Sequence, residues 1–566
     1  MDARRTTAPL SAAASAAAAA AAAAAQALLP EVRTVHAAAQ RLFTLLGGER
    51  ASEAQLRAID LVVARLRARS VLHPHAFYPL GFGEPSALAV VARSIRWQQH
   101  ALLRAAEPAV GAGAKAEAEA EARRAHEATV EVIAPRLVAA DDLGRCADAR
   151  GIARVHEGSF ASPAQGLVMP AHCVPLSCLT ARFQLITPLS WRRNAAGNAP
   201  LRGAESGAAD AGADADLADV RQAQPVAILL AGTGEQSFAR RRQLVALPLA
   251  RAGIASVILE SPYYGSRRPP LQVASKLRTM VDLPLLGRMT IEEARALVRW
   301  LRARRGVSQF AGAESGAEAD AGAGAADAAD AADAHGAVVL AGVSMGGLHA
   351  AMTASLLPPA WRDVGVASWL GPPSGAAVFT RGALALGTDF AALARDVEDP
   401  MASLALEDGL CQLEALLYMR PGALTPAASA AENSGGGGAD GGGFAVPRSA
   451  FPTRADTAAL AAFFGGVRPG ALEAAQRQAV RLLRLTDITN FAPPARPDAA
   501  VFVTGSADAY VPPHADTLDM WEHVRREWRG CDVRTLRGGH VTGSMFSIDA
   551  YVRTVAEVAR KIIARR

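Results

Sequence analysis

The stretch Ala337-Val-Val-Leu-Ala-Gly-Val-Ser-Met-Gly-Gly347 decides the fold expected of this chain. It begins with a short apolar run that ends in glycine, which is typical of a buried parallel strand. It continues as Gly342-x-Ser344-x-Gly346, and a helix-compatible stretch follows at residues 348–357. A serine on a tight strand-to-helix turn needs small residues two positions before and after it, because larger side chains would clash there. The stretch therefore predicts a strand, a sharp turn that presents Ser344, and a helix.

Similar apolar runs recur on both sides of this stretch. Several of them end in glycine, and helical patterns such as residues 240–252 and 290–304 lie between them. Strand and helix in alternation predict an α/β fold with a mostly parallel, doubly wound sheet. A strand is also expected at residues 152–160, where the pattern alternates. The other strands are expected at residues 181–187, 225–231, 254–260, 337–341, 365–370, 500–504 and 532–536.

The chain divides into three regions. Residues 1–30 form a low-complexity N-terminal segment, residues 31–150 follow helical patterns, and residues 151–566 hold the α/β domain. Inside that domain, residues 376–495 are mainly helical, and helices above the carboxyl edge of a parallel sheet would form a lid over a ligand crevice. Three segments rich in Ala, Gly, Asp, Glu and Ser lack the large apolar residues needed to offset the entropy of ordering. We expect disordered inserts at residues 194–224, 311–334 and 425–444.

The first 30 residues have the composition of a targeting peptide. Residues 3–30 contain arginine, serine and a long alanine run, and no acidic residue. This combination is typical of an organelle transit peptide, which predicts a mitochondrial or plastid location. The alternative is an alanine expansion without a role, driven by a GC-rich genome, and then a cytoplasmic location.

Composition excludes several classes of protein. Of the 566 residues 51% are hydrophobic and 20% are charged, which is enough apolar material for a large core. The net charge of +5 comes without an aromatic-interleaved basic stripe, so no nucleic-acid partner is expected. Five scattered cysteines are too few for a disulfide scaffold. Neither Cys-x-x-Cys nor His-Glu-x-x-His occurs, so neither a structural zinc site nor a zincin is expected. The reaction expected below needs no metal and no organic cofactor.

If Ser344 is a catalytic nucleophile on such a turn, an acid and a histidine are needed later in the chain, in the order Ser…Asp/Glu…His. Asp508 comes three residues after Gly505, at the end of an expected strand, whereas its competitor Asp487 follows a helical pattern. His540 directly follows the last expected strand, after a pair of glycines, whereas His514 and His523 do not follow a strand. We therefore expect Ser344, Asp508 and His540 to be the catalytic residues. Backbone N–H groups of Thr233, Gly234 and Met345 would form the oxyanion hole.

The core of the chain resembles the α/β-hydrolase domain-containing protein 18 family. The resemblance covers about residues 150–310, 335–420 and 485–560, and it implies an α/β-hydrolase fold. It also implies serine hydrolase action on an acyl ester, with a lipid as the expected substrate. The matching stretches are Glu157-Gly-Ser-Phe-Ala-Ser-Pro163, Ala181-Arg-Phe-Gln-Leu-Ile-Thr-Pro188, Ala231-Gly-Thr-Gly-Glu235 with Arg240-Arg-Arg242, Leu259-Glu-Ser-Pro-Tyr-Tyr-Gly265, Gly342 to Gly347, Asp508-Ala-Tyr-Val-Pro512 and Gly538-Gly-His540.

Basic and aromatic side chains within these stretches are candidates for substrate binding. A phosphate or carboxylate on the substrate would suit two or more arginines that face the crevice. The alternative for the arginines is a solvated helix face, and the tyrosines are expected to pack or orient rather than react. These candidates are Arg240, Arg241, Arg242, Tyr263 and Tyr264.

The expected partner is a small-molecule or lipid ester, with peripheral membrane contact if the substrate is a lipid. Two other functions stay open. An acyltransferase would use the same three residues and an alcohol in place of water. A catalytically silent hydrolase fold would serve as a binding protein, although an intact triad in the correct order argues against it.

Overall fold

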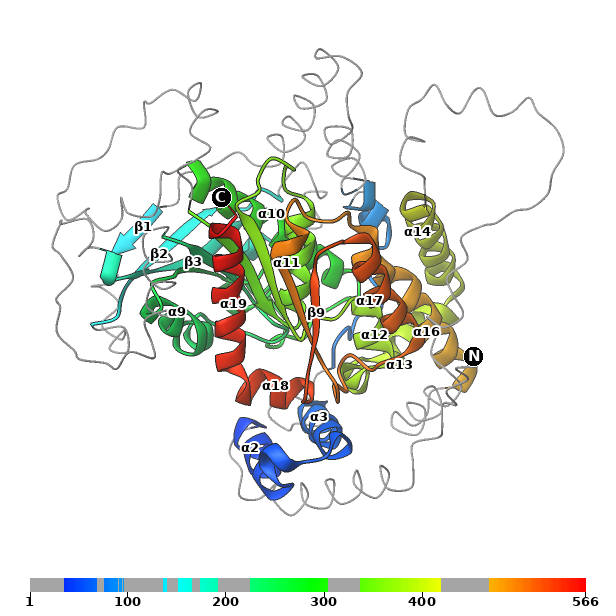
Figure 1. The fold of residues 1–566 in the computed structure, drawn as a ribbon. Coiled ribbons are helices and arrows are strands. Elements are labelled where there is room, and N and C mark those ends of the chain that lie inside the picture. The colour runs from blue at the N-terminus through cyan, green and yellow to red at the C-terminus, as the bar shows by residue number, and fades with distance from the viewer. Residues whose placement is uncertain are drawn as a thin grey trace, which may run out of the picture.

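One mixed sheet forms the centre of the molecule (Figure 1). The computed structural model describes residues 35–68, 76–89, 91–93, 95, 136–139, 151–164, 174–191, 224–303, 336–418 and 468–565. Within these ranges nine strands pair in the order β1-β2-β3-β5-β4-β6-β7-β8-β9. The six strands from β5 to β9 along this order are parallel, and β1, β2 and β3 form an antiparallel edge.

All eight predicted strands are present, and no bound differs from the prediction by more than two residues. They are β2 (Ala153–Ala161), β3 (Thr180–Pro188), β4 (Val226–Leu230), β5 (Ala255–Leu259), β6 (Val338–Val343), β7 (Val364–Trp369), β8 (Ala500–Gly505) and β9 (Asp532–Leu536). The ninth strand, β1 (Arg136–Ala139), lies in the region that was expected to be helical. It is a four-residue strand on the open side of β2, where pairing along a single edge holds it.

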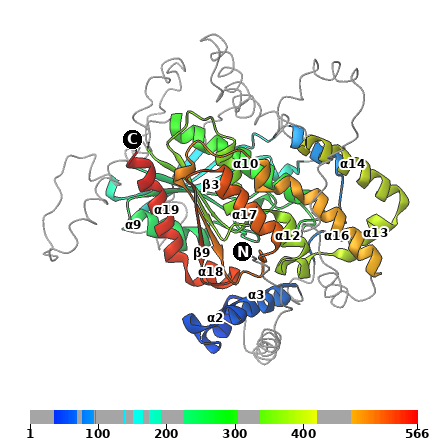
Figure 2. The same cartoon turned by 45° about the vertical axis from the view of Figure 1, so that its right-hand side comes forward.

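Five of the six parallel strands, β4 to β8, are buried on both faces, and successive side chains enter different cores; β9, at the end of the sheet, is partly exposed. On β4, Ile228 and Leu230 join one hydrophobic cluster, and Ala227 and Leu229 join the other. Helices α10 (Asp282–Ala303), α11 (Met345–Ser355) and α17 (Ala515–Glu527) cover the first face. Helices α9 (Leu247–Arg251) and α19 (Ile548–Ile563) cover the second (Figure 2). This two-sided cover is the reason that the strands read as continuous apolar runs.

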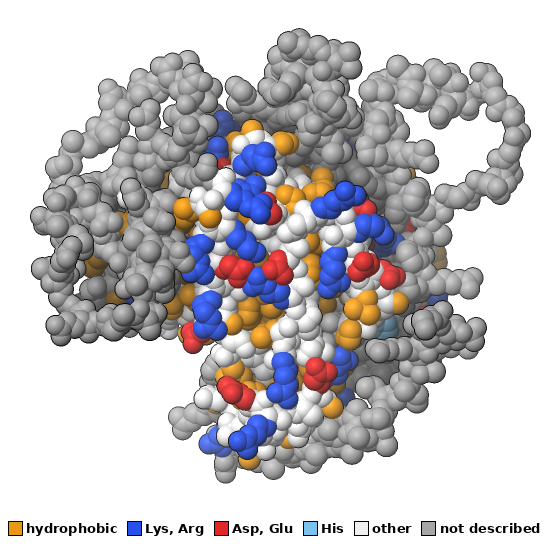
Figure 3. Space-filling view, in the orientation of Figure 1, with side chains coloured by type: hydrophobic (Ala, Val, Ile, Leu, Met, Phe, Trp, Pro, Cys, Tyr) orange, Lys and Arg blue, Asp and Glu red, His pale blue; other side chains and the backbone are white. Residues whose placement is uncertain are grey.

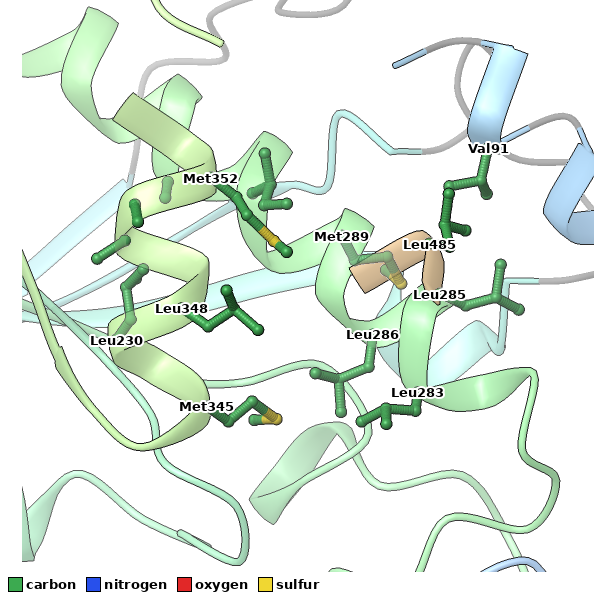
Figure 4. Packing of buried hydrophobic residues seen from close by; sticks show 14 of the residues in the cluster. Val91, Leu230, Leu283, Leu285, Leu286, Met289, Met345, Leu348, Met352 and Leu485 are labelled. Atoms are coloured by element: carbon green, nitrogen blue, oxygen red, sulfur yellow. The ribbon is translucent and has the colours of Figure 1, made fainter. Parts of the chain in front are cut away.

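Helix α11 is anchored on α10 through large apolar side chains. Met345, Leu348 and Met352 of α11 point toward Leu286 and Met289 of α10 (Figure 4). Burial of such a side chain stabilises the fold by about 2 kcal/mol. The packing therefore fixes the start of α11, which is the residue that follows Ser344.

A group of helices lies beside one end of the sheet. It contains α12 (Gly375–Thr380), α13 (Phe390–Glu398), α14 (Pro400–Tyr418) and α16 (Pro469–Leu483), which fall within the predicted lid region. Helices α12 and α13 pack on α16, and α14 packs on α13 and α16. The N-terminal helices α2 (Val35–Leu45) and α3 (Glu53–Ala68) lie elsewhere, beside α18 (His540–Phe546), as both ribbon views show (Figures 1 and 2).

Several predictions fall on residues outside the described ranges. They are the transit segment 1–30, the inserts 194–224 (except Gln224), 311–334 and 425–444, and residues 419–467 of the predicted lid region.

Basic and acidic side chains are interspersed on the face of the molecule that carries α19 and β9 (Figure 3). Arg534 of β9 pairs with Glu557 of α19 at 2.6 Å, and Lys561 pairs with the same carboxylate at 3.1 Å. These ion pairs tie the last strand to the last long helix. Among the described residues, no helix has both the length and the apolar character needed to span a membrane.

Candidate functional site

Ser344 stands at a strained turn between β6 and α11. Its backbone has φ 58° and ψ −125°, a conformation that a residue with a side chain rarely adopts. Its N–H donates to the carbonyl oxygen of Trp369 at 2.8 Å, which holds the turn against β7. A Cβ on Gly342 would come within 2.3 Å of the carbonyl carbon of Gly346, so the glycines on both sides of Ser344 are needed for close approach. The turn has the form that an exposed nucleophilic serine requires.

Asp508 and His540 form a hydrogen-bonded pair. Asp508 follows β8, His540 begins α18 just after β9, and Asp508 Oδ2 lies 2.7 Å from His540 Nδ1. The second oxygen of Asp508 accepts from the N–H groups of Tyr510 and Val511 at 2.8 and 2.9 Å. The ring of Tyr510 stacks on the imidazole with 4.7 Å between centroids. Backbone N–H groups therefore hold the Asp508 carboxylate in place, and the Tyr510 ring holds the imidazole of His540.

The environment of His540 raises its pKa. Burial acts to lower the pKa, because it penalises the charged imidazolium. The Asp508 carboxylate outweighs burial by its charge and its hydrogen bond, and a further carboxylate, Asp60, acts in the same direction. A histidine that holds a proton more tightly than usual is a stronger base once it is deprotonated.

Ser344 and His540 line the same cavity, whose volume is about 560 Å³. This volume lies within the usual range for small-molecule sites. Much of the wall is apolar. The larger aliphatic side chains and the phenylalanine in the lining are Val63, Phe77, Leu229, Leu230, Leu244, Val245, Val343, Leu384, Val541, Met545 and Ile548.

The loop after β4 borders the serine. Thr233 and Gly234 line the cavity, and a Cβ on Gly232 would lie 3.1 Å from the carbonyl oxygen of Val343 and 3.9 Å from Ser344 Cβ. Gly232 donates its N–H to Glu235 Oε2 at 3.1 Å, which fixes the loop. The side chain of Met345 is buried in the core, so only its backbone could serve the oxyanion hole.

The three arginines after this loop have separate surroundings. Arg240 is exposed and lines the cavity. Arg241 lines it too, but its guanidinium is buried, donates to the carbonyl oxygens of Leu229 and Leu259 at 2.6 and 2.8 Å, and lies 3.2 Å from Glu235. Arg242 donates to Gln184 at 2.9 Å and is not part of the cavity lining. Arg241 thus ties the ends of β4 and β5 together, and Arg240 is the arginine of the three placed to meet a ligand.

Tyr263 and Tyr264 lie in the hydrophobic core, with 1% and 0% of their surface exposed. Neither tyrosine is among the residues that line the cavity. Tyr263 has φ 64°, and Gln272 donates to its carbonyl oxygen at 2.6 Å, so this residue shapes the loop after β5. We therefore correct the expected substrate contact to a packing role for both tyrosines.

The other candidate acid and histidines stand apart from this site. Asp487 is buried beside Arg484 between two short helices of the 376–495 region. His514 precedes the first residue of α17, and His523 lies within that helix. A further histidine close to Ser344 in the sequence, His349, is buried in α11 near Gly287 of α10, where burial lowers its pKa to about 4. None of these four residues lines the cavity.

Two cationic side chains that line the cavity were not among the site residues predicted from the sequence. Arg67 of α3 and Lys276 both line it, in segments that carried no chemical motif. Lys276 Nζ lies 4.2 Å from the centre of the Phe77 ring, and burial followed by the charge of Arg67 lowers its pKa to about 8. Lysine is scarce in this chain, and that scarcity is the one signal that could have singled out Lys276.

Two segments that lie far apart in the sequence add residues to the lining of the cavity. Of the predicted lid, only residues of the short helix at Ala383–Gly387 line it within the described part of the chain. The N-terminal helices add Ala39 from α2 and several residues of α3, including Val63 and Arg67. The described residues contain no group of three or more His, Cys, Asp or Glu side chains placed to hold a metal ion.

Two comparisons relate this chain to known proteins. The family model described as alpha/beta hydrolase domain containing 18 matches residues 215–314 and 326–561, which is more than half of the chain. A solved structure, the acylaminoacyl peptidase of Pyrococcus horikoshii in its orthorhombic crystal form, is 10% identical with a TM-score of 0.31. The match covers 73% of this chain and 41% of the peptidase, so this chain spans less than half of that protein. On the evidence of the family model, this chain belongs to the alpha/beta hydrolase domain containing 18 family and has the α/β-hydrolase fold.

Proposed function

We propose that this protein is a serine hydrolase that cleaves an acyl ester, with a lipid as the substrate class. One observation carries the proposal: the strained serine turn and the Asp508–His540 pair open on the same largely apolar cavity. A nucleophile, a base and an orienting acid that meet at a hydrophobic pocket are the parts that acyl transfer through an acyl-enzyme needs.

In the first half of the reaction, Ser344 Oγ attacks the ester carbonyl. Because Nδ1 of His540 is engaged with Asp508, Nε2 is the ring nitrogen that takes the serine proton. Asp508 keeps the imidazole in this tautomer and stabilises the imidazolium that forms. His540 then gives the proton to the leaving alcohol, and the acyl group stays on Ser344.

Developing negative charge on the carbonyl oxygen needs donors that are already in place. The backbone N–H groups of Met345 and of the Thr233–Gly234 loop are our candidates, because this loop packs against the serine turn. One such donor contributes a factor of about 10² to 10³ in rate in other serine hydrolases. In the second half of the reaction, water attacks the acyl-enzyme with His540 as the base and releases the acid.

The charges around the cavity suggest which esters fit best. Arg67, Arg240 and Lys276 line it together, whereas the carboxylate of Glu235 already serves Arg241 and Gly232. An apolar wall suits an acyl chain, and a group of cations suits a carboxylate or phosphate on the same molecule. We therefore expect an ester that carries an anionic group.

The test is labelling with a fluorophosphonate probe, which reacts with activated serines. We expect the wild type to be labelled and both Ser344→Ala and His540→Ala to lose at least 99% of the labelling rate. Ser544→Ala is the matched control, since Ser544 lines the same cavity from α18 and its hydroxyl donates to the carbonyl oxygen of Val541. Labelling that persists in Ser344→Ala, or a folded wild type that is not labelled, would contradict the proposal. Product analysis with an added acceptor alcohol then separates hydrolysis from acyl transfer.

A further inference from the structure

Asp60 is a buried carboxylate on α3, far from the catalytic motifs in the sequence. It is 0% exposed and lies on the same helix as the buried apolar residues Leu56, Ile59 and Val63. A buried carboxylate is costly unless hydrogen bonds satisfy it. The partners of Asp60 therefore show what holds it there.

The carboxylate joins the two loops that carry Asp508 and His540. Its Oδ2 accepts from the N–H of Ala509 at 3.0 Å and from the N–H of His540 at 2.6 Å. Its Oδ1 accepts from the N–H of Val541 at 2.8 Å. One side chain thus binds the residue next to Asp508 and the backbone of His540 itself.

Gly539 provides the space for this contact. Its φ is −87°, so its backbone is open to any residue, but a Cβ there would lie 2.7 Å from Asp60 Oδ2. The glycine before His540 is therefore needed because the carboxylate lies against it.

Asp60 also carries charge into the surroundings of His540. Burial, with a smaller effect of Asp508, raises the pKa of Asp60 to about 7, while His540 and the backbone N–H groups act to lower it. The charged or titratable groups around the imidazole are Asp508, Asp60 and Arg67, together with the stacked Tyr510. Of these, the two carboxylates favour the imidazolium and Arg67 opposes it.

We propose that Asp60 is a positioning residue for His540: its carboxylate holds the two loops in the alignment that brings Asp508 to the imidazole, and it adds negative charge beside the ring. The inference rests on the proposed function, and it makes an N-terminal helix part of the active site. Asp60 lies outside the residues that the family model matches.

The competing explanation is that Asp60 only docks α3 on the domain. Asp60→Asn separates the two, because an amide has the same shape but neither the charge nor the second acceptor oxygen. A docking role predicts lower stability alone. A positioning role predicts in addition that the pKa of His540 falls by about one unit, because negative charge no longer favours the imidazolium.

The experiment follows the histidine by NMR in the full chain with isotope-labelled histidine. The His540 signal is assigned as the one missing in His540→Gln. The pKa of His540 and the pH profile of fluorophosphonate labelling are measured in the wild type and in Asp60→Asn. Glu53→Gln removes an exposed acid from the same helix, and Ile59→Ala weakens the packing of α3 but keeps the carboxylate.

We expect Asp60→Asn to lower the pKa of His540, to move the acidic limb of the labelling profile down by about one pH unit and to slow labelling at least tenfold. Both controls should leave the pKa and the limb in place. An unchanged pKa in folded Asp60→Asn overturns the inference and leaves the proposed function standing. If Asp60→Asn changes the pKa of His540 but the folded wild type is never labelled, the proposed function is overturned instead.

Gly539→Ala gives a second route if Asp60→Asn does not fold. It keeps every charge and pushes the carboxylate away from the backbone of His540. We expect the same direction of change in the pKa of His540, and at least tenfold slower labelling. A folded Gly539→Ala protein with the wild-type pKa and labelling rate would refute the positioning role.

Discussion

Gly346 lies so close to the end of β4 that a Cβ on it would come within 2.5 Å of the carbonyl oxygen of Leu230. The contact involves backbone, which cannot swing aside as a flexible side chain would. Gly346 thereby seats the first turn of α11 directly on the strand that precedes the Thr233–Gly234 loop, so the serine turn and this loop share one rigid support.

Gly346→Ala should therefore damage both the fold and the site. We expect the free energy of unfolding to fall by about 3 kcal/mol, because overpacking against backbone must shift α11. Gly470→Ala is the matched control, since nothing lies within 4 Å of the added carbon and it sits in the first turn of α16. Denaturant unfolding measures both, and a Gly346→Ala protein as stable as the control would contradict this view of the turn.

Asp508→Asn should leave the fold intact and lower the labelling rate and kcat about a thousandfold or more. The amide cannot hold the required tautomer of His540 or stabilise its cation. Asp487→Asn, which changes the other candidate acid, should leave both rates within about twofold. If Asp487→Asn were the more damaging of the two changes, the assignment of the acid would be wrong.

Lys276→Met should weaken the binding of anionic esters selectively. The comparison uses p-nitrophenyl octanoate and the mono-p-nitrophenyl ester of octanedioic acid, which differ in a terminal carboxylate. We expect KM for the anionic ester to rise about tenfold, the size expected for a lost charge-assisted hydrogen bond, and KM for the neutral ester to stay the same. Lys276→Arg, which keeps the charge, should retain most of the preference.

The same lysine predicts a pH dependence. Its pKa of about 8 means that the ammonium loses its proton as the pH rises past 8. In the wild type, KM for the anionic ester should therefore rise through this range, and in Lys276→Met it should not. Equal pH profiles in the two proteins would remove Lys276 from the binding site.

Asp487 should make the protein less stable as the pH rises from about 4 to about 6. Burial raises its folded-state pKa to about 6 from the ordinary 3.8, so the folded state binds more protons in this window. The stabilising contribution is complete below pH 4 and is lost as the pH rises through 6, to the extent of about 3 kcal/mol. Asp487→Asn should flatten this slope in thermal unfolding, and Asp519→Asn, at an exposed position, should not.

The sheet could be predicted because its signal is local. Most of the predicted strands, such as β4, β5, β6 and β7, are short apolar runs, and burial on both faces imposes that pattern on the sequence itself; β2 shows the alternation of a half-buried strand instead. Strand β1 was missed because four residues on an edge need little apolar character. The residues after β4, β6, β8 and β9 could be placed together because parallel strands bring their carboxyl ends to one edge.

The remaining parts of the site depend on contacts that no local pattern encodes. The three adjacent arginines are alike in sequence, yet Arg241 caps strand ends while Arg240 faces the cavity. The contact between Asp60 and Ala509 spans 449 positions in the chain. The only sign of this contact in the sequence is an acid among the apolar residues Leu56, Ile59 and Val63 of one helix. That pattern does not identify the groups that the acid binds.

That same separation has a consequence for biosynthesis. Helix α3 leaves the ribosome about 450 residues before the backbone groups that it binds. A growing chain therefore carries Ser344 for nearly two hundred residues before His540 and its support exist. On the proposed mechanism, Ser344 is activated only after both segments have been made, so a product that ends before His540 or lacks α3 carries the serine without the groups that activate it.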